Sequence, residues 1–588
     1  MTHCAIGSAE FSEADLQQNF LTGKKRLLSL LVAAIFLFCG IFLRLAYIQV
    51  VWGAELQTKA SDQWTRDLPI VAYRGDIVDR NGVVLAGTKT GFALYARPAS
   101  VDDAEAESAA LADVLGLPQA DVYAKISKKG VSEVRLVRQM DETLAEKVRA
   151  LDLPGVYLAE QGERVYGYGD MLCQTLGFVS ADGTGQMGLE AYYDKYLKGV
   201  NGSVLTETDL VGKELSGGEM TYVPAIDGMT LRLTIDMRVQ SIVEDVLQLA
   251  YVRQGAASTK CIVMDVNSGE ILAMGAKPGV DLNNLPRDDV QTLLKNSKNT
   301  LLTDVYEPGS TFKILTAAAC LNEYEAGNPN AFGPDHIFNS SGVRIIDGSK
   351  ISCWTKHANG KHSNENLADA LKNSCNPVFT DIALSLGKDT FYKYLSAFGY
   401  GKPSGIDFDG EQGGLLVSQS TVTRGDLARI GFGQSIAVTA MQLACATAAA
   451  VNGGLLLRPY LVKEIVDPTT GQVAARFGSE VRGRAVSEST SKQIAEMLRR
   501  VVAEGGGKNA NVEGCEVGGK TGTAQKFVDG KLAVGKYVSS FVGFFPASAP
   551  KYLVLFIVDE PQGQSYGSIV AAPYAGSIIR GISDVEGA

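Results

Sequence analysis

The sequence predicts three parts: one transmembrane helix, a mixed α+β domain, and a larger α/β (α+β) domain. An apolar run lies near the N-terminus, short alternating segments mixed with helical ones follow it, and strand-like runs flank alanine-rich helices in the second half. A chain of 588 residues is long enough for several domains. The predicted boundaries are a tail at 1–26, the membrane helix at 27–51, the first domain at 52–225, the second at 226–582 and a short tail at 583–588.

The N-terminal apolar run LLSLLVAAIFLFCGIFL, residues 27–43, follows the basic cluster Lys24-Lys25-Arg26. Together with the apolar residues after Arg44 it reaches the roughly 20 residues that a bilayer core requires. The basic cluster favours a cytoplasmic N-terminus, with the chain from about residue 52 outside the cytoplasm. A cleaved signal peptide is the competing interpretation, but the run lacks a small-residue cleavage site after it. Residues 1–26 are expected to form a disordered cytoplasmic tail.

Composition and charge exclude several classes of protein. The net charge is −10 and the isoelectric point is about 5.2, whereas a nucleic-acid-binding chain is typically basic. The four histidines and nine cysteines show no zinc-like spacing, and the sequence has no phosphate-binding or dinucleotide-binding loop. We therefore expect no metal, no cofactor and no nucleic-acid partner.

The second domain begins and ends with strand patterns. Residues 230–250 read as a strand followed by a helix, and residues 259–276 as a β-hairpin with its turn at Asn267-Ser268-Gly269. Two further strand-like runs, 536–548 and 551–561, lie near the C-terminus. Strands at both ends with helices between them predict a single sheet that pairs the ends of the domain. In the first domain, VRLVRQ reads as a strand and DETLAEKVRALDL as a helix.

Three short motifs follow one another in the second domain: Ser310-x-x-Lys313, Ser374-Cys375-Asn376 and Lys520-Thr521-Gly522-Thr523. Each is weak alone, because short patterns recur by chance in a long chain. Further SxxK or Lys-Thr-Gly matches begin at Lys89, Ser385, Ser489 and Ser548. The order and context of the three motifs distinguish them from these matches. Lys89-Thr90-Gly91 is expected to be an ordinary turn.

Ser310 and Lys313 lie three residues apart, on one face of the first turn of a predicted helix. A serine hydroxyl needs an adjacent base to act as a nucleophile. Burial and a neighbouring cation such as Lys520 can lower the pKa of a lysine until it is neutral near pH 7. Lys313 can then take the proton of Ser310. The alternative is a helix-capping serine beside a lysine that reaches solvent.

The other two motifs supply groups that a peptide substrate would need. Ser374 can relay a proton to a leaving amine, and the Asn376 amide can hold Lys313 and bind a substrate amide. The third motif reads as a strand whose Gly522 allows close approach of another backbone. A peptide can add alongside this edge, with Lys520, Thr521 and Thr523 near its carboxylate. Turn-forming residues at a helix end remain the alternative for the second motif, and an ordinary Lys-Thr-Gly turn remains the alternative for the third.

These residues resemble the penicillin-binding proteins and serine β-lactamases, which share the SxxK, SxN and KTG signature. The resemblance is to the monofunctional class B D,D-transpeptidases in particular, and it extends from the anchor almost to the C-terminus. Further stretches that resemble family boxes are RGDIVDRNG (74–82), GQMGLEAYYDKYLKG (185–199), TDVYEPGSTFK (303–313) and GFGQSIAVTAMQLA (431–444). Ala440 stands where the family usually has proline, which is expected to alter a helix start rather than the chemistry.

The resemblance implies a catalytic domain with a serine transpeptidase/β-lactamase-like fold, preceded in the chain by a pedestal domain. It also implies attack of Ser310 on the penultimate D-Ala of a peptidoglycan stem peptide, release of D-Ala, and transfer of the acyl group to an amine. β-Lactams would acylate Ser310. Other implied partners are a glycan polymerase and septal or sporulation proteins, and an elongation role stays open. Alternative activities are D,D-carboxypeptidase, β-lactamase and β-lactam sensor.

Cys375 stands inside the second motif, and Cys353 lies upstream in a loop-like stretch. We hypothesise that these two thiols form a disulfide that blocks the site, which would make activity redox-dependent. The alternative is that both cysteines pack as small apolar residues.

Overall fold

The computed structural model describes residues 13–53, 55–56, 65–131, 133–207, 220–339, 341–355, 362, 364–528 and 531–587. The chain divides into two compact units. One consists of Met1–Ile70 and Asn201–Ala225, and the other of Val71–Val200 and Ile226–Ala588. Each unit therefore combines segments that are far apart in the sequence.

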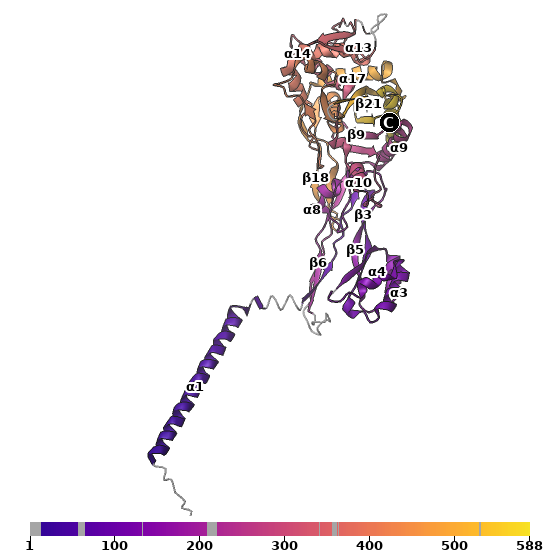
Figure 1. Ribbon diagram of the computed structural model, residues 1–588. Helices are drawn as coiled ribbons and strands as arrows, with labels where there is room; N and C mark the ends of the chain where they lie inside the picture. The colour runs from indigo at the N-terminus through magenta and orange to yellow at the C-terminus, as the bar shows by residue number, and fades with distance from the viewer. Residues whose placement is uncertain are drawn as a thin grey trace, which may run out of the picture. The chain divides into compact units, whose positions relative to one another are not determined.

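The first unit contains helix α1, Glu13–Val50 (Figure 1). Its part Lys24–Val50 is long and apolar enough to cross a membrane, which agrees with the membrane helix predicted at 27–51. Because α1 begins at Glu13, the expectation of a disordered tail is wrong for residues 13–26. Extending an existing helix costs little, and half of this segment consists of Gln, Leu, Lys and Arg residues, which favour helix. Residues 1–12 lie outside the described residues.

The first unit also contains a three-stranded antiparallel sheet. Strand β1 (Thr65–Ile70) pairs with β6 (Gly202–Glu207), and β6 pairs with β7 (Met220–Val223). The sheet thus joins the chain just after the anchor to the chain just before the predicted boundary at residue 225.

A seven-stranded sheet in the second unit contains strands from both sides of that boundary. Its order is β18-β17-β8-β2-β3-β4, with β5 also paired to β3. The strands are β2 (Ile77–Val78), β3 (Val84–Ala96), β4 (Val134–Met140), β5 (Val156–Tyr166), β8 (Thr230–Leu233), β17 (Val462–Val466) and β18 (Val473–Arg476). Helices α3 (Ala104–Leu115), α4 (Gln119–Ile126) and α5 (Glu142–Arg149) share an apolar core with β3 and β4. The strand VRLVRQ and the helix that follows it are therefore confirmed.

Lys89-Thr90-Gly91, expected to be a turn, lies inside strand β3. In the register with β5, Lys89 is opposite Glu163 and Gly91 is opposite Gln161. A Cβ atom at Gly91 would lie 3.4 Å from the Cβ of Glu163, which is an ordinary contact distance. This position therefore does not require glycine, as a tight turn would. Pairing along the whole of β5 overrides the weak local preference of glycine for turns.

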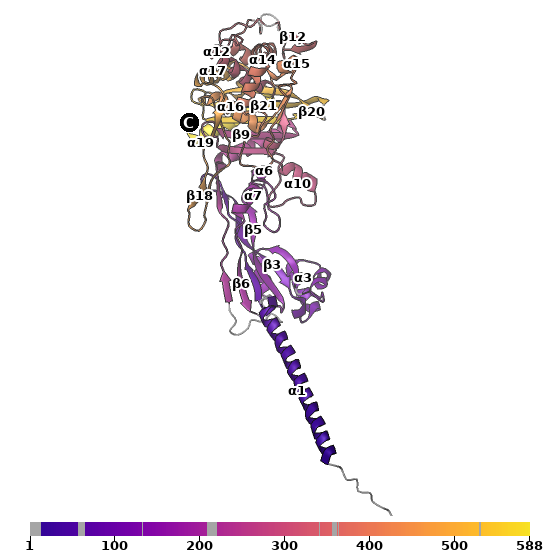
Figure 2. The same ribbon diagram turned by 90° about the vertical axis from the view of Figure 1, so that its left-hand side faces the viewer.

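The larger domain is built on a five-stranded sheet of order β10-β9-β22-β21-β20. The strands are β9 (Ser258–Asp265), β10 (Ile271–Lys277), β20 (Gly518–Val528), β21 (Lys531–Phe545) and β22 (Tyr552–Asp559). The predicted hairpin and both C-terminal strands are confirmed. Strand β9 pairs with β22, so the sheet joins the two ends of the domain, as the magenta and yellow strands of Figures 1 and 2 show.

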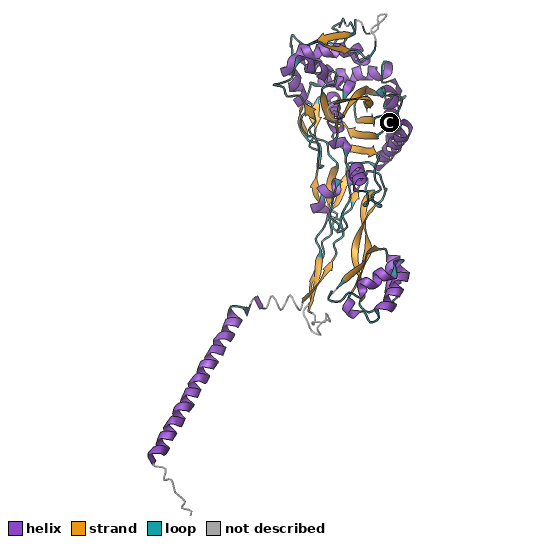
Figure 3. Ribbon diagram, in the orientation of Figure 1, coloured by secondary structure: helices purple, strands orange, loops and turns teal. Residues whose placement is uncertain are grey.

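Helices cover both faces of this sheet (Figure 3). Alternate residues of β22 enter different apolar clusters: Leu553 and Leu555 face one, while Val554 and Phe556 face the other. A strand buried on both faces reads as a continuous apolar run, as YLVLFIV does. Helices α9 (Met237–Gln254) and α19 (Ala572–Glu586) belong to the second cluster, and α12 (Lys313–Glu325), α14 (Asn376–Ala397), α16 (Ala440–Val451) and much of α17 (Glu488–Glu504) to the first.

Shorter elements connect these layers. They are α6 (Cys173–Leu176), α7 (Gly188–Tyr192), α8 (Asp194–Leu197), α10 (Val290–Ser297), α11 (Thr300–Thr303), β11 (Val305–Tyr306), β12 (Val343–Ile346), β13 (Ser349–Ser352), α13 (Leu367–Lys372), β14 (Leu415–Leu416), α15 (Arg424–Ile430), β15 (Ile436–Thr439), β16 (Leu455–Leu457), β19 (Val481–Arg484) and α18 (Gly567–Val570). Ala440 is the first residue of α16, which Thr439 caps together with Gln442. A helix thus starts where the family usually has proline.

Candidate active site

The first motif lies where a short 3-10 helix, Gly309–Phe312, runs directly into α12. Gly309 has a φ of 54°, a conformation that glycine adopts easily, and its N–H donates to the carbonyl of Gly433 over 3.0 Å. Ser310 is half-buried, whereas Lys313 is completely buried. The helix therefore presents the hydroxyl toward open space and keeps the amine inside the protein.

The second motif surrounds the Lys313 amine with acceptors. Lys313 Nζ donates to the Ser374 carbonyl over 2.8 Å, to Ser374 Oγ over 3.1 Å and to Asn376 Oδ1 over 2.7 Å. Ser374, with a φ of 56°, lies in the turn between α13 and α14, and Asn376 is the first residue of α14. The predicted contact between Asn376 and Lys313 is present, and the three acceptors match the three donors of an ammonium.

Burial changes the pKa of both motif lysines. It lowers the pKa of Lys313 to about 7, although Cys353, Cys375 and Glu365 act in the opposite direction. The pKa of Lys520 is lowered well below its ordinary value, first by burial and then by the nearby charge of Lys313. Lys313 can thus exchange a proton near neutral pH, which a general base for a serine hydroxyl requires.

The third motif lies on β20, the edge strand of the five-stranded sheet. A Cβ atom at Gly522 would come within 2.5 Å of Ser540 Oγ and 2.9 Å of the Pro308 carbonyl. Glycine therefore lets this strand approach the chain just before Ser310. Thr523 Oγ1 accepts a hydrogen bond of 2.9 Å from the N–H of Gly567. Lys520 Nζ donates to the carbonyl of Thr521 over 3.1 Å.

The three motifs line one cleft of about 840 Å³. Its walls include Ser310, Ser374, Asn376, Lys520, Thr521 and Thr523. Lys313 lies behind this wall, bonded to Ser374 and Asn376, and Gly522 lies within the strand that forms one side. The fold therefore brings together every predicted catalytic and substrate-binding residue. A second cavity of about 720 Å³, next to the far end of β20, has none of these residues in its walls.

Sequence reasoning missed several residues of the cleft. Trp354, Tyr566 and Glu365 also line it, and Glu365 is buried, with 4 % of its surface exposed. Trp354 directly follows Cys353, and its Nε1 donates to the carbonyl of Asn373 over 2.9 Å. No local pattern distinguishes these residues from ordinary surface aromatics or acids, although Trp354 stands beside a cysteine that the sequence had singled out.

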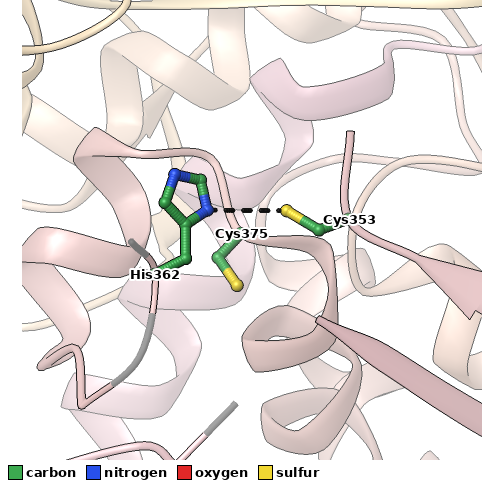
Figure 4. Close-up of side chains that lie close together, drawn as sticks. All are labelled: Cys353, His362 and Cys375. Carbon is green, nitrogen blue, oxygen red and sulfur yellow. Dashed lines mark hydrogen bonds between the residues drawn. The ribbon is translucent and has the colours of Figure 1, made fainter. Parts of the chain in front are cut away.

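The two cysteines singled out from the sequence lie next to each other. Cys375 is completely buried and Cys353 is half-buried, and the structure holds both as thiols. The pKa of the Cys375 thiol is raised, first because the thiol shares a hydrogen bond with Cys353 and then because it is buried. The side chain of His362 reaches the same place, with Nδ1 3.6 Å from Cys353 Sγ (Figure 4). The disulfide stays a prediction.

Comparison with known proteins supports the resemblance of these motifs to those of the penicillin-binding proteins. The penicillin-binding protein transpeptidase domain matches residues 259–580, and the penicillin-binding protein dimerisation domain matches residues 69–233. Stage V sporulation protein D of Bacillus subtilis is 39% identical over 563 residues, covering 95% of this chain and 85% of that protein. Peptidoglycan D,D-transpeptidase FtsI of Escherichia coli K12 is 29% identical over 547 residues, covering 92% and 88%.

A solved structure shows the same fold. The peptidoglycan synthetase of Bifidobacterium adolescentis superposes with a TM-score of 0.70 at 26% identity, and the match covers 89% of this chain and 97% of that one. The domain match, the curated relatives and the assembled motifs agree. The chain therefore belongs to the class B penicillin-binding proteins, and it is a transpeptidase with a dimerisation-type pedestal.

Proposed function

We propose that this enzyme cross-links peptidoglycan stem peptides through an acyl-enzyme on Ser310. Ser310 Oγ attacks the carbonyl of the penultimate D-Ala, the terminal D-Ala leaves, and an amine of a second stem peptide takes over the acyl group. The same serine would be acylated by β-lactams. The observation that carries this proposal is the buried Lys313 amine, with its pKa near 7, one helical turn from a hydroxyl that faces the cleft.

Each group of the site has a step in this reaction. Lys313 takes the proton of Ser310, and Ser374, 3.1 Å from Lys313 Nζ, passes a proton to the leaving amine. Asn376 holds the lysine and offers its NH₂ group. The backbone N–H groups of Ser310 and Thr523 would form the oxyanion hole. The peptide would lie along β20, with its carboxylate near Lys520, Thr521 and Thr523, while Gly522 leaves room for the approaching chain.

The anchor supports a location for the enzyme. With the basic residues Lys24-Lys25-Arg26 in the cytoplasm, both domains would lie on the outer side of a single-pass membrane helix. Peptidoglycan and β-lactams are available on that side. The similarity to stage V sporulation protein D supports a place in spore-cortex synthesis, and that to FtsI supports a place at the division septum. Glycan polymerases and septal or sporulation proteins would be its partners.

The proposal is tested by labelling the full chain in detergent with fluorescent penicillin and incubating it with a pentapeptide donor and an amine acceptor. Ser310→Ala is expected to abolish labelling. Ser385→Ala is the matched control, because Ser385 also begins an SxxK match but donates to the carbonyl of Asn330. Labelling of Ser310→Ala would overturn the assignment of the nucleophile. Release of D-Ala without cross-linked product would identify a carboxypeptidase, and rapid hydrolysis of penicillin a β-lactamase.

A further inference from the structure

Three side chains with possible zinc-ligand atoms come together at the second motif. The Sγ atoms of Cys353 and Cys375 and a ring nitrogen of His362 all lie within 4.8 Å of one another. The Cys353 Sγ to His362 Nδ1 distance is 3.6 Å, and Figure 4 shows both side chains reaching toward each other beside Cys375. Cys375 is completely buried, while the other two residues are half-buried.

We propose that Cys353, His362 and Cys375 bind a zinc ion. Thiolate and imidazole are the ligands that zinc prefers, at about 2.3 Å from sulfur and about 2.0 Å from nitrogen. Tetrahedral angles with these bond lengths separate sulfur from nitrogen by about 3.5 Å and sulfur from sulfur by about 3.8 Å. The observed Cys353 Sγ to His362 Nδ1 distance already matches, and the other two ligand–ligand distances need to shorten by about 1.3 Å at most.

A buried carboxylate beside the cluster gives independent support. Glu365 is 4 % exposed, and its Oε2 atom is buried without a hydrogen-bond partner among the described residues. Glu365 and His362 line the same cleft, three residues apart in the sequence. A buried carboxylate oxygen without a partner is costly unless a cation or a proton donor reaches it. Glu365 Oε2 would occupy the fourth coordination position of the zinc ion, directly or through a water molecule. Its other oxygen, Oε1, accepts a hydrogen bond from Asn373 Nδ2.

Zinc binding would involve proton release and no redox step. The two thiols each lose a proton and bind as thiolates, His362 binds through a neutral nitrogen, and the zinc ion stays divalent. The disulfide hypothesis uses the same two sulfur atoms, but it removes two electrons and needs an oxidant. The two states exclude each other, because a disulfide leaves no thiolate for the metal.

The cluster is connected to the catalytic residues by neighbouring positions in the chain and by a hydrogen bond. Cys375 lies between Ser374 and Asn376, which both accept from Lys313. Asn376 Nδ2 also donates to the carbonyl of Ser352 over 3.1 Å, one residue before Cys353. Trp354 and His362 line the cleft itself. A zinc ion would therefore fix the end of β13 and the wall of the cleft to the second motif.

The test measures zinc in the full chain, purified in detergent under a non-thiol reductant and without chelator. Mass spectrometry of the metal is expected to give about one zinc ion per chain. Cobalt loaded in place of zinc should give a thiolate charge-transfer band. Cys353→Ser, His362→Ala and Cys375→Ser should each lower zinc affinity by tenfold or more, and Glu365→Gln by about tenfold.

Two variants serve as matched controls. Cys320→Ser changes a buried cysteine that bonds the backbone of Phe332, and His336→Ala removes a histidine that packs against Phe332 and Phe338. Both should keep the zinc content and the cobalt band. Penicillin labelling reports separately whether each variant is folded, so a failed zinc site is distinguishable from a failed active site. Reduced, labelling-competent protein that takes up no zinc would overturn the proposal, as would unchanged binding in Cys353→Ser and Cys375→Ser.

Discussion

Arg74 Nε donates to Glu190 Oε2 over 2.6 Å and joins two sequence boxes that are 116 residues apart. Glu190 has no exposed surface, and its other oxygen accepts from Arg164 Nε over 2.7 Å. Arg74 also reaches Asp194 over 2.6 Å. The RGDIVDRNG and GQMGLEAYYDKYLKG boxes thus meet around one buried carboxylate.

Glu190→Gln is expected to destabilise the pedestal strongly. The change removes the charge that two buried arginines share, and breaking a buried ion pair in this way costs about 3 to 5 kcal/mol. The measurement is the denaturant midpoint of unfolding. Glu163→Gln is the control, because the Lys89–Glu163 pair is more exposed and exposed pairs contribute roughly 1 kcal/mol or less. Equal midpoint shifts in the two variants would refute the structural role given to Glu190.

The elements of the larger domain were predictable because their patterns are strong. The hairpin β9–β10 has a turn at Asn267-Ser268-Gly269, and β22 is apolar along its whole length because both faces are covered. The site was predictable from three motifs in a fixed order. Their residues meet because the sheet edge, the start of α12 and the turn before α14 border the same cleft.

Other features depend on contacts that no local pattern carries. The sequence Lys89-Thr90-Gly91 is typical of a turn, but pairing with β5 keeps these residues in an extended strand. Glu365 and His362 were not identified, because a buried carboxylate and a histidine near a thiol come together only through tertiary packing. Spacing in the sequence does not predict a group of possible metal ligands that tertiary packing brings together, and Cys353, His362 and Cys375 are such a group.

The rate of acylation by penicillin should rise with pH through about 7. Lys313 acts as a base only when it is neutral, and burial lowers its pKa to about 7, so the neutral fraction grows about tenfold from pH 6 to pH 8. Stopped-flow measurement of fluorescent penicillin binding checks this. Lys313→Arg keeps the positive charge at all these pH values and should acylate at least about a hundredfold more slowly. Lys492→Arg, at an exposed position on α17, should leave the rate and its pH profile unchanged. A flat profile in the wild type would contradict the role of Lys313.

Asn376→Asp should move this pH profile upward. The new carboxylate would take the place of an amide oxygen 2.7 Å from Lys313 Nζ and would stabilise the protonated lysine. An opposite charge at this distance raises the pKa of a lysine by about 1 to 3 units, so acylation at pH 7 should be slower and recover at higher pH. Asn330→Asp, on the exposed surface, provides the control for the added charge. A uniform loss of rate at every pH would instead indicate that Asn376 acts through substrate contacts alone.

Gly433→Ala should impair acylation although Gly433 is not a motif residue. A Cβ atom there would be 2.0 Å from the Gly309 carbonyl, and Gly433 has a φ of 83° that side chains rarely adopt. The clash would displace the residue before Ser310, and a shift of about 1 Å of a catalytic group can cost on the order of 100-fold in rate. Gly483→Ala is the matched control, because among the described residues, its two chain neighbours aside, no heavy atom lies within 4 Å of its Cβ position. Both variants should be compared in labelling rate and in melting temperature. If the Gly433→Ala enzyme melts at the same temperature as the control but is labelled slowly, the effect is due to the position of Ser310. Labelling at the wild-type rate would show that the contact between Gly433 and Gly309 does not position the nucleophile.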